Sequence, residues 1–144
     1  MLLLLWSTVI QAQEVLDPSE ATDETSLTPE EILLKVYDRT GGFRWTSHVN
    51  WLSEDICSYE GVACYPQTEA LAGHVREVDL ASNHLVGTLP GDIFALPYLE
   101  TLIVRDNPNL VVTFDNAHEA QHLKNLVISN TQTQSLTSIN AVLD

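Results

Sequence analysis

Residues 75–98 read VREVDLASNHLVGTLPGDIFALPY, and the same pattern returns at residue 99 and again at residue 123. The first residues of these stretches, Val75, Leu99 and Leu123, therefore recur with a 24-residue period. The fourth and sixth places are apolar in each stretch: Val78, Leu102 and Leu126, then Leu80, Val104 and Ile128. A short strand with this pattern buries one face, and a single unit cannot bury it alone, so neighbouring units must stack. The period predicts a solenoid with repeats at 75–98, 99–122 and 123–144.

The ninth place of the first two stretches is an asparagine, Asn83 and Asn107, whereas Thr131 stands there in the third. An asparagine after a strand can satisfy backbone groups where the chain turns away. The order L-x-x-L-x-L-x-x-N resembles the leucine-rich repeat, and the continuation Leu85-x-Gly87-x-Leu89-Pro90 is similar to the plant-type subclass of that family. The resemblance implies an α/β repeat fold: a leucine-rich repeat solenoid with a short parallel sheet on its concave face.

The segment before the repeats resembles the N-terminal cap of plant-type leucine-rich repeat proteins. It contains Gly41-Gly42, Trp45, Trp51-Leu52 and the run Cys57-Ser58-Tyr59-Glu60-Gly61-Val62-Ala63-Cys64, in which Tyr59 replaces the usual tryptophan. The resemblance implies a helical cap in which Cys57 and Cys64 form a disulfide, and a pair of buried reduced thiols is the alternative. We expect Trp45 and Trp51 to lie in the core of the cap, and exposed rings that stack on a ligand are the alternative.

The sequence Thr28-Pro29-Glu30-Glu31 predicts the start of a helix that runs to about Arg39. A threonine N-cap, a proline at the first helical position and a glutamate at the third form a capping-box pattern. The apolar residues lie on one stripe at helical spacing, and Gly41-Gly42 ends the helix. These residues are Ile32, Leu33, Val36 and Tyr37. We expect this stripe to cover the open end of the first repeat.

The chain divides into four segments. Residues 1–13, with an apolar run from Leu2 to Ile10, predict either a signal peptide or a truncated membrane anchor. Residues 14–28 are acidic and are expected to be a disordered linker. Residues 29–74 form the cap, and residues 75–144 form the repeats. We expect the array to be incomplete at its C-terminus, because Leu136, Ile139, Val142 and Leu143 are apolar where a terminal unit would present a polar face.

Twenty acidic and six basic residues give the chain a formal net charge of -14. This charge repels phosphate backbones, so we exclude nucleic acid as a partner. A disulfide implies an oxidising compartment, which agrees with a secretory segment at the start. We therefore expect an extracellular or cell-surface location, either as a secreted protein or as an ectodomain with a membrane tether at the start of this chain or outside it.

The string His118-Glu119-Ala120-Gln121-His122 matches the motif H-E-x-x-H. On a helix, this spacing places two histidines on one face as zinc ligands, with the glutamate as general base. A zinc hydrolase needs a third ligand, and no His, Cys or Glu follows His122. We therefore expect no catalytic residues, no cofactor and no enzymatic activity. His118 and His122 are kept as candidate ligands for an adventitious metal, and a zinc hydrolase is kept as the rival function.

The outward-facing positions of the expected concave sheet are the candidate ligand-binding surface, because side chains alternate along a strand. In the first unit they are Glu77, Asp79, Ala81 and Ser82, in the second Thr101, Ile103, Arg105 and Asp106, and in the third Asn125, Val127, Ser129 and Asn130. The resemblance implies a receptor-like or secreted recognition module that binds a protein, peptide or glycan on this face. A fragment without a partner is the alternative, because three short strands barely reach the roughly 800 Å² per side of a standard interface.

Overall fold

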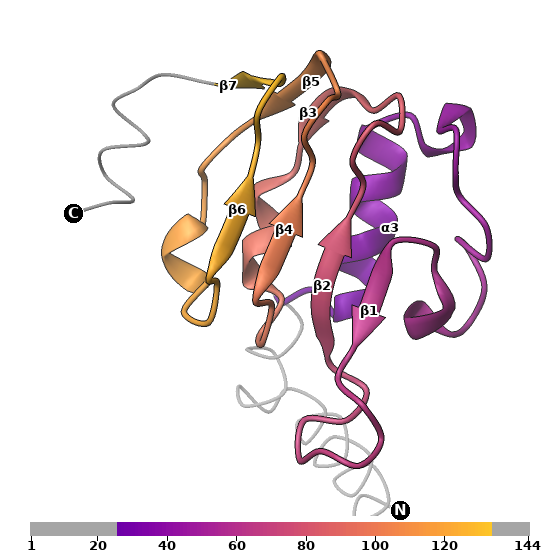
Figure 1. Cartoon of the computed structure of the whole chain (residues 1–144), viewed down its shortest axis with the longest axis vertical. Coiled ribbons are helices and arrows are strands. Elements are labelled where there is room, and N and C mark those ends of the chain that lie inside the picture. Colours follow the sequence, from indigo (N-terminus) through magenta and orange to yellow (C-terminus); the bar gives the residue numbers. More distant parts are fainter. Residues whose placement is uncertain (1–25, 134–144) are drawn as a thin grey trace, which may run out of the picture.

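The computed structural model of the chain describes residues 26–133. These residues form a mixed α/β fold with one α-helix and two sheets that contain parallel strands (Figure 1). The expected signal peptide or anchor (1–13), nearly all of the expected linker (14–28) and the apolar residues Leu136, Ile139, Val142 and Leu143 lie outside the described residues. Within residues 26–133, no helix has the length and apolar character that crossing a membrane requires.

The helix α3 (Pro29–Arg39) has the predicted bounds and the predicted capping box. Thr28 Oγ1 accepts a hydrogen bond from Glu31 N at 3.2 Å, and the Glu31 carboxylate accepts one from Thr28 N at 2.8 Å. Three residues of the apolar stripe are buried, and Tyr37 is half-buried; the buried three are Ile32, Leu33 and Val36. The helix contacts β3 (Val86–Leu89) and the short 3-10 helix η4 (Gly91–Ala95), so it covers the side of the first unit.

The first sheet contains β1 (Val62–Cys64), β2 (Val75–Asp79), β4 (Thr101–Ile103) and β6 (Asn125–Val127), side by side in that order (Figure 1). The strands β2, β4 and β6 are parallel, and Glu77 lies opposite Thr101, which lies opposite Asn125. The 24-residue period of the sequence is thus the register of this sheet. The strand β1 was not predicted, and it extends the sheet from the cap by pairing antiparallel with β2.

A second parallel sheet contains β3, β5 (Asn109–Val112) and β7 (Gln132–Thr133). The expectation of one short sheet was incomplete, because this sheet does not follow the 24-residue period. Val86 lies opposite Asn109 and Val111 lies opposite Gln132, so both offsets are shorter than the period, and the second is shorter than the first. The connection from the first to the second strand of each unit shortens by one residue at a time, from residues 80–85 to 104–108 and then to 128–131, which accounts for the first offset. In the second pair, β7 is displaced further along β5, because Gln132 lies opposite Val111 and not opposite Asn109. An alignment with a fixed 24-residue period therefore predicts the wrong register for β3, β5 and β7.

The core of the first two units consists of the apolar residues that the sequence pattern predicted. Val78, Leu80, Leu102 and Val104 are at most 2% exposed. In the third unit, Leu123, Leu126 and Ile128 are only partly buried. The side chains of Asn83 and Asn107 are also buried, as expected for groups that bind the backbone at a turn. Burial therefore decreases toward β6.

The core of the cap is a cluster of aromatic rings. Trp45 and Trp51 are 3% and 7% exposed, which confirms that they are core residues. Tyr59, where the family has a tryptophan, is 1% exposed, and its ring lies 4.7 Å from that of Trp51. Its hydroxyl donates to Ser53 O at 3.1 Å, and burial raises the pKa of this phenol. The tyrosine therefore packs within the aromatic cluster and satisfies its own polar atom.

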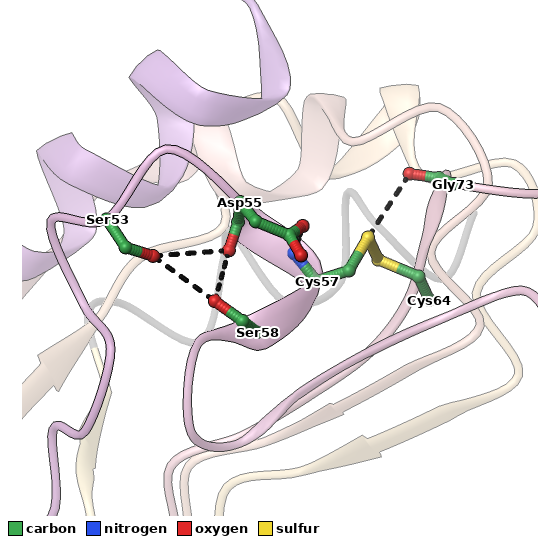
Figure 2. Close-up of a disulfide and its surroundings, with 6 residues drawn as sticks. All are labelled: Ser53, Asp55, Cys57, Ser58, Cys64 and Gly73. Carbon is green, nitrogen blue, oxygen red and sulfur yellow. Dashed lines mark hydrogen bonds between the residues drawn. A yellow bond between two sulfur atoms is a disulfide. The ribbon is translucent and has the colours of Figure 1, made fainter.

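A disulfide joins Cys57 to Cys64, as the resemblance implied, so the alternative of two reduced thiols is wrong (Figure 2). Cys57 lies in the 3-10 helix η3 (Ile56–Ser58), and Cys64 ends β1. Asp55 caps η3 by accepting a hydrogen bond from Cys57 N at 3.0 Å. The bond therefore fastens the loop of the cap to the edge of the first sheet.

Candidate functional site

The candidate surface is the outward face of β2, β4 and β6, which we call the strand face. Its members are ten of the twelve positions that the sequence analysis named, without Ala81 and Asn130: Glu77, Asp79, Ser82, Thr101, Ile103, Arg105, Asp106, Asn125, Val127 and Ser129. None of the ten is buried. The register aligns them in rows across the strands, with Asp79 opposite Ile103 and Ile103 opposite Val127. The structure thus brings these residues together on one surface.

The alignment of the rows continues beyond the ends of the strands. Ser82 N donates to Arg105 O at 3.0 Å, and Asp106 N donates to Ser129 O at 2.9 Å. The backbone is left-handed at the same place of each unit, with φ of +51° at Ser82, +58° at Asp106 and +56° at Asn130. Asp106 and Asn130 are residue types enriched in the left-handed region, whereas Ser82 is not, so residue type gave a signal for this turn in two of the three units.

A hollow of about 380 Å³ lies where the strand face meets the cap. The repeats line it with Asp79, Leu80, Ala81, Ser82, Asn83 and Arg105, and the cap lines it with Ser47, Glu60 and Gly61. The sequence analysis missed the three cap residues. Asn83 holds the cap there, since its Oδ1 accepts from Ser47 N at 2.6 Å and its Nδ2 donates to Ser47 O at 2.8 Å.

Charged side chains form a row beside the strand face, at positions 76, 100 and 124. The Glu100 carboxylate lies 3.4 Å from Arg76 Nε and 3.1 Å from Lys124 Nζ. The hydrogen bond from Lys124 holds the pKa of Glu100 below its ordinary value. The Arg76 guanidinium also lies over the ring of Tyr65, 5.8 Å from its centroid. The Glu100 carboxylate therefore interacts with residues at the starts of both β2 and β6, and it lies at the start of β4 itself.

A row of rings runs next to these charges, at positions 74, 98 and 122. The centroid of Tyr98 lies 4.7 Å from that of His74 and 5.3 Å from that of His122. The sequence analysis did not select this row. A signal was present, because each residue directly precedes the first residue of a unit and the row repeats with the same period as the strands.

The helix that the H-E-x-x-H match requires is not formed. The 3-10 helix η5 covers only Ala117–Glu119, and His122 lies beyond its end. Two histidines at positions i and i+4 share a face only on a continuous α-helix. Within residues 26–133, no three side chains of His, Cys, Asp or Glu gather closely enough to hold a metal ion. The rival hypothesis of a zinc hydrolase requires His118 and His122 on one face of an α-helix, and the described structure does not place them so.

The fold defined by these elements is a mixed α/β fold, with parallel strands in register and a disulfide-linked cap. No family model matches the chain, and no curated protein matches it. Solved structures do match. A plant ice-binding protein has a TM-score of 0.60 and 25% identity, over 71% of this chain and 32% of that one. The BIR2 ectodomain from Arabidopsis thaliana has a TM-score of 0.58 and 14% identity, over 75% and 57%.

A chain of the BIR3 - SERK2 complex from Arabidopsis thaliana is less similar, with a TM-score of 0.48 and 17% identity, over 71% of this chain and 68% of that one. The chain spans about a third of the length of the ice-binding protein and just over half of that of the BIR2 ectodomain. The likeness to these two structures establishes a shared fold.

Proposed function

We propose that this chain is a non-enzymatic, extracellular recognition module of the plant-type leucine-rich repeat family. It binds a protein, peptide or glycan on the concave side of the sheet, which is the strand face. The repeat motifs, the cap motifs and the 24-residue register of β2, β4 and β6 support the family assignment together. The fold that the chain shares with a plant ectodomain and a plant ice-binding protein also supports it.

The observation that carries the proposal is the strand face itself. Three parallel strands present rows of polar and apolar side chains that no other described segment covers. Binding surfaces of this kind combine hydrogen-bonding side chains with apolar contacts. Here Thr101 and Asn125 supply the first, and Ile103 and Val127 supply the second.

The disulfide supports the proposed location, because such bonds persist in oxidising compartments. A secreted protein and the ectodomain of a receptor-like protein both satisfy this requirement. The absence of enzymatic activity belongs to the same proposal, since the motif that favoured a zinc hydrolase lies on a short 3-10 helix and the segment after it.

The test is a binding screen of the full chain against ectodomains, secreted peptides and cell-wall oligosaccharides. Ligands found in the screen are then measured with Thr101→Arg, which places a long cation in the middle of the strand face. Glu54→Arg is the matched control, because Glu54 is exposed and belongs to the cap and not to the strand face. We expect binding to fall by about tenfold or more in Thr101→Arg alone. Ligands that bind both variants equally well would place the site elsewhere.

A further inference from the structure

The strand face changes in chemistry from the cap toward β6. On the cap side, β2 presents Glu77 and Asp79, which alternate with Val78 and therefore lie on the same face of the strand. Toward β6, the register places Ile103 opposite Asp79 and Val127 opposite Ile103. Both of these apolar side chains are only partly buried. The face is therefore acidic at one end and apolar at the other.

The carboxylates at the acidic end have no cationic partner. Among residues 26–133, none of Glu60, Glu77 and Asp79 forms an ion pair. Arg105 is the cation that lines the hollow, and it is already paired with Asp106 at 2.7 Å. The negative charge at this end is thus uncompensated within the described structure, and it attracts a positive group from outside.

The carboxylates of β2 are accessible because the residues opposite them on β1 are small. Ala63 lies opposite Glu77, and Asp79 N donates to Gly61 O at 2.7 Å. A Cβ atom at Gly61 would lie 2.3 Å from Asp79 O, so no side chain fits there. Gly61 lines the hollow of about 380 Å³ together with Ser47, Ser82 and Asp79. The size of the hollow and its polar walls suit the end of one long side chain.

We infer that the strand face binds an extended segment of a partner protein in which a lysine or arginine lies two positions from an apolar side chain. The basic group enters the hollow beside Asp79 and Glu60, and the apolar group lies over Ile103 and Val127. Alternate side chains of an extended segment are roughly 6.7 Å apart, and neighbouring strands are about 4.8 Å apart. The two anchors therefore reach positions one to two strands apart. An uncharged glycan would leave the carboxylates uncompensated, so a peptide is favoured.

This inference rests on the proposed function and is tested with a displayed library of short random peptides, selected on the immobilised full chain. The selected peptides are then measured against the double variant Glu77→Gln/Asp79→Asn, which removes both charges and keeps the shapes. The matched control is Glu54→Gln/Asp115→Asn, which removes two exposed charges outside the strand face. Thr101→Arg reports whether a peptide uses the face at all.

We expect the selected peptides to share a basic residue two positions from an apolar one. Their affinity should fall by about tenfold or more in Glu77→Gln/Asp79→Asn and on replacement of their basic residue by glutamine, and it should weaken as salt is added. The control variant should bind as the original chain does.

Peptides without a shared basic residue, or with unchanged affinity for the double variant, would overturn the inference. If Thr101→Arg still weakens such peptides, the proposed function stands and only the partner class is wrong. If Thr101→Arg has no effect on them, both proposals fail for peptides. A library that yields no binder overturns the peptide inference and leaves glycans and folded ectodomains as ligands of the same face.

Discussion

Asn107 is a buried side chain whose hydrogen bonds go to the backbone of the unit before it and of its own unit. Its Oδ1 accepts from Asn83 N and from Leu85 N, each at 3.0 Å, and its Nδ2 donates to Leu80 O at 2.9 Å. Asn107→Ala leaves these groups unpaired in the core. Because each unpaired buried group costs about 1–3 kcal/mol, we expect the free energy of unfolding to fall by about 3 kcal/mol.

Urea denaturation measures this loss, with Asn125→Ala as the control. Asn125 is exposed and donates one hydrogen bond, 3.2 Å, to Thr101 Oγ1, so its removal should cost less than about 0.5 kcal/mol. Equal losses in the two variants would mean that the buried amide does not hold the turn.

Gly61 combines a left-handed backbone, φ +89°, with a close approach to another strand. Gly73 has nearly the same backbone, φ +85°, but a Cβ atom there would meet no atom within 4 Å. Gly73→Ala should therefore cost only the left-handed strain of about 1–2 kcal/mol. Gly61→Ala should cost clearly more, because Asp79 O must also move. Thermal melts of the two variants measure the difference, and equal shifts would contradict the proposed contact between β1 and β2.

At the scale of residues, the sequence predicted those roles that recur with the period. Asn83 and Asn107 occupy the same place of consecutive units, and both are buried at turns. Tyr59 departs from the motif that the sequence resembles, and only the structure shows how its hydroxyl reaches Ser53 O. The left-handed turn at Ser82 was not predicted, because serine is not enriched in this conformation as its counterparts Asp106 and Asn130 are.

The row formed by Arg76, Glu100 and Lys124 joins the starts of β2, β4 and β6 at one carboxylate. Because Lys124 holds the pKa of Glu100 below its ordinary value, the row stabilises the folded state when Glu100 is ionised. That stability is fully present above the ordinary glutamate pKa of about 4.3 and is lost as the pH falls through the lower pKa of the folded state. We expect Glu100→Gln to be less stable than the original chain at neutral pH and equally stable in strong acid.

Urea denaturation across the acid range measures this difference, and added salt should reduce it because the three side chains are at the surface. Glu54→Gln is the matched control, since Glu54 forms no ion pair in the described part of the chain. A difference between Glu100→Gln and the original chain that persists unchanged into strong acid would contradict the prediction.

At the scale of elements, signals that use local chemistry or an exact period gave correct predictions. The capping box located α3, and the 24-residue period gave the register of β2, β4 and β6. The second sheet was missed because its register is shorter than that period and changes from one strand pair to the next. The strand β1 was missed because Val62–Cys64 is too short to show alternation, and its pairing depends on contacts with the distant β2.

Across the whole molecule, burial decreases from the first two units to the third. Leu102 is 0% exposed, whereas its counterpart Leu126 is only partly buried. Leu102→Ala should therefore lower the free energy of unfolding by about 2–5 kcal/mol, as core truncations do. Leu126→Ala should cost less than half as much, because less apolar surface is removed from contact. Urea denaturation of both variants measures the ratio, and equal costs would show that the third unit is as well packed as the second.

At this same scale, only part of the candidate site followed from the sequence. Alternation along the strands selected the repeat residues of the strand face, and the structure places them on one surface. The cap residues Ser47, Glu60 and Gly61 join them through folding alone, because no spacing relates them to Asp79. Contacts between the cap and the repeats do not recur at a fixed spacing along the sequence. The three cap residues of the site were therefore found only from the structure.

The direction of the asparagine contacts has a consequence for the order in which the chain matures during synthesis. Asn83 closes the loop of the cap at Ser47, and Asn107 closes the turn of the first unit. A ribosome adds about 5–20 residues per second, so Asn107 follows Asn83 by about 1–5 s. During that interval the first unit lacks the acceptor for Asn83 N. The turn of the first unit is therefore completed only after the second unit has been made, whereas Thr131 of the third unit donates to Ile128 O of its own unit.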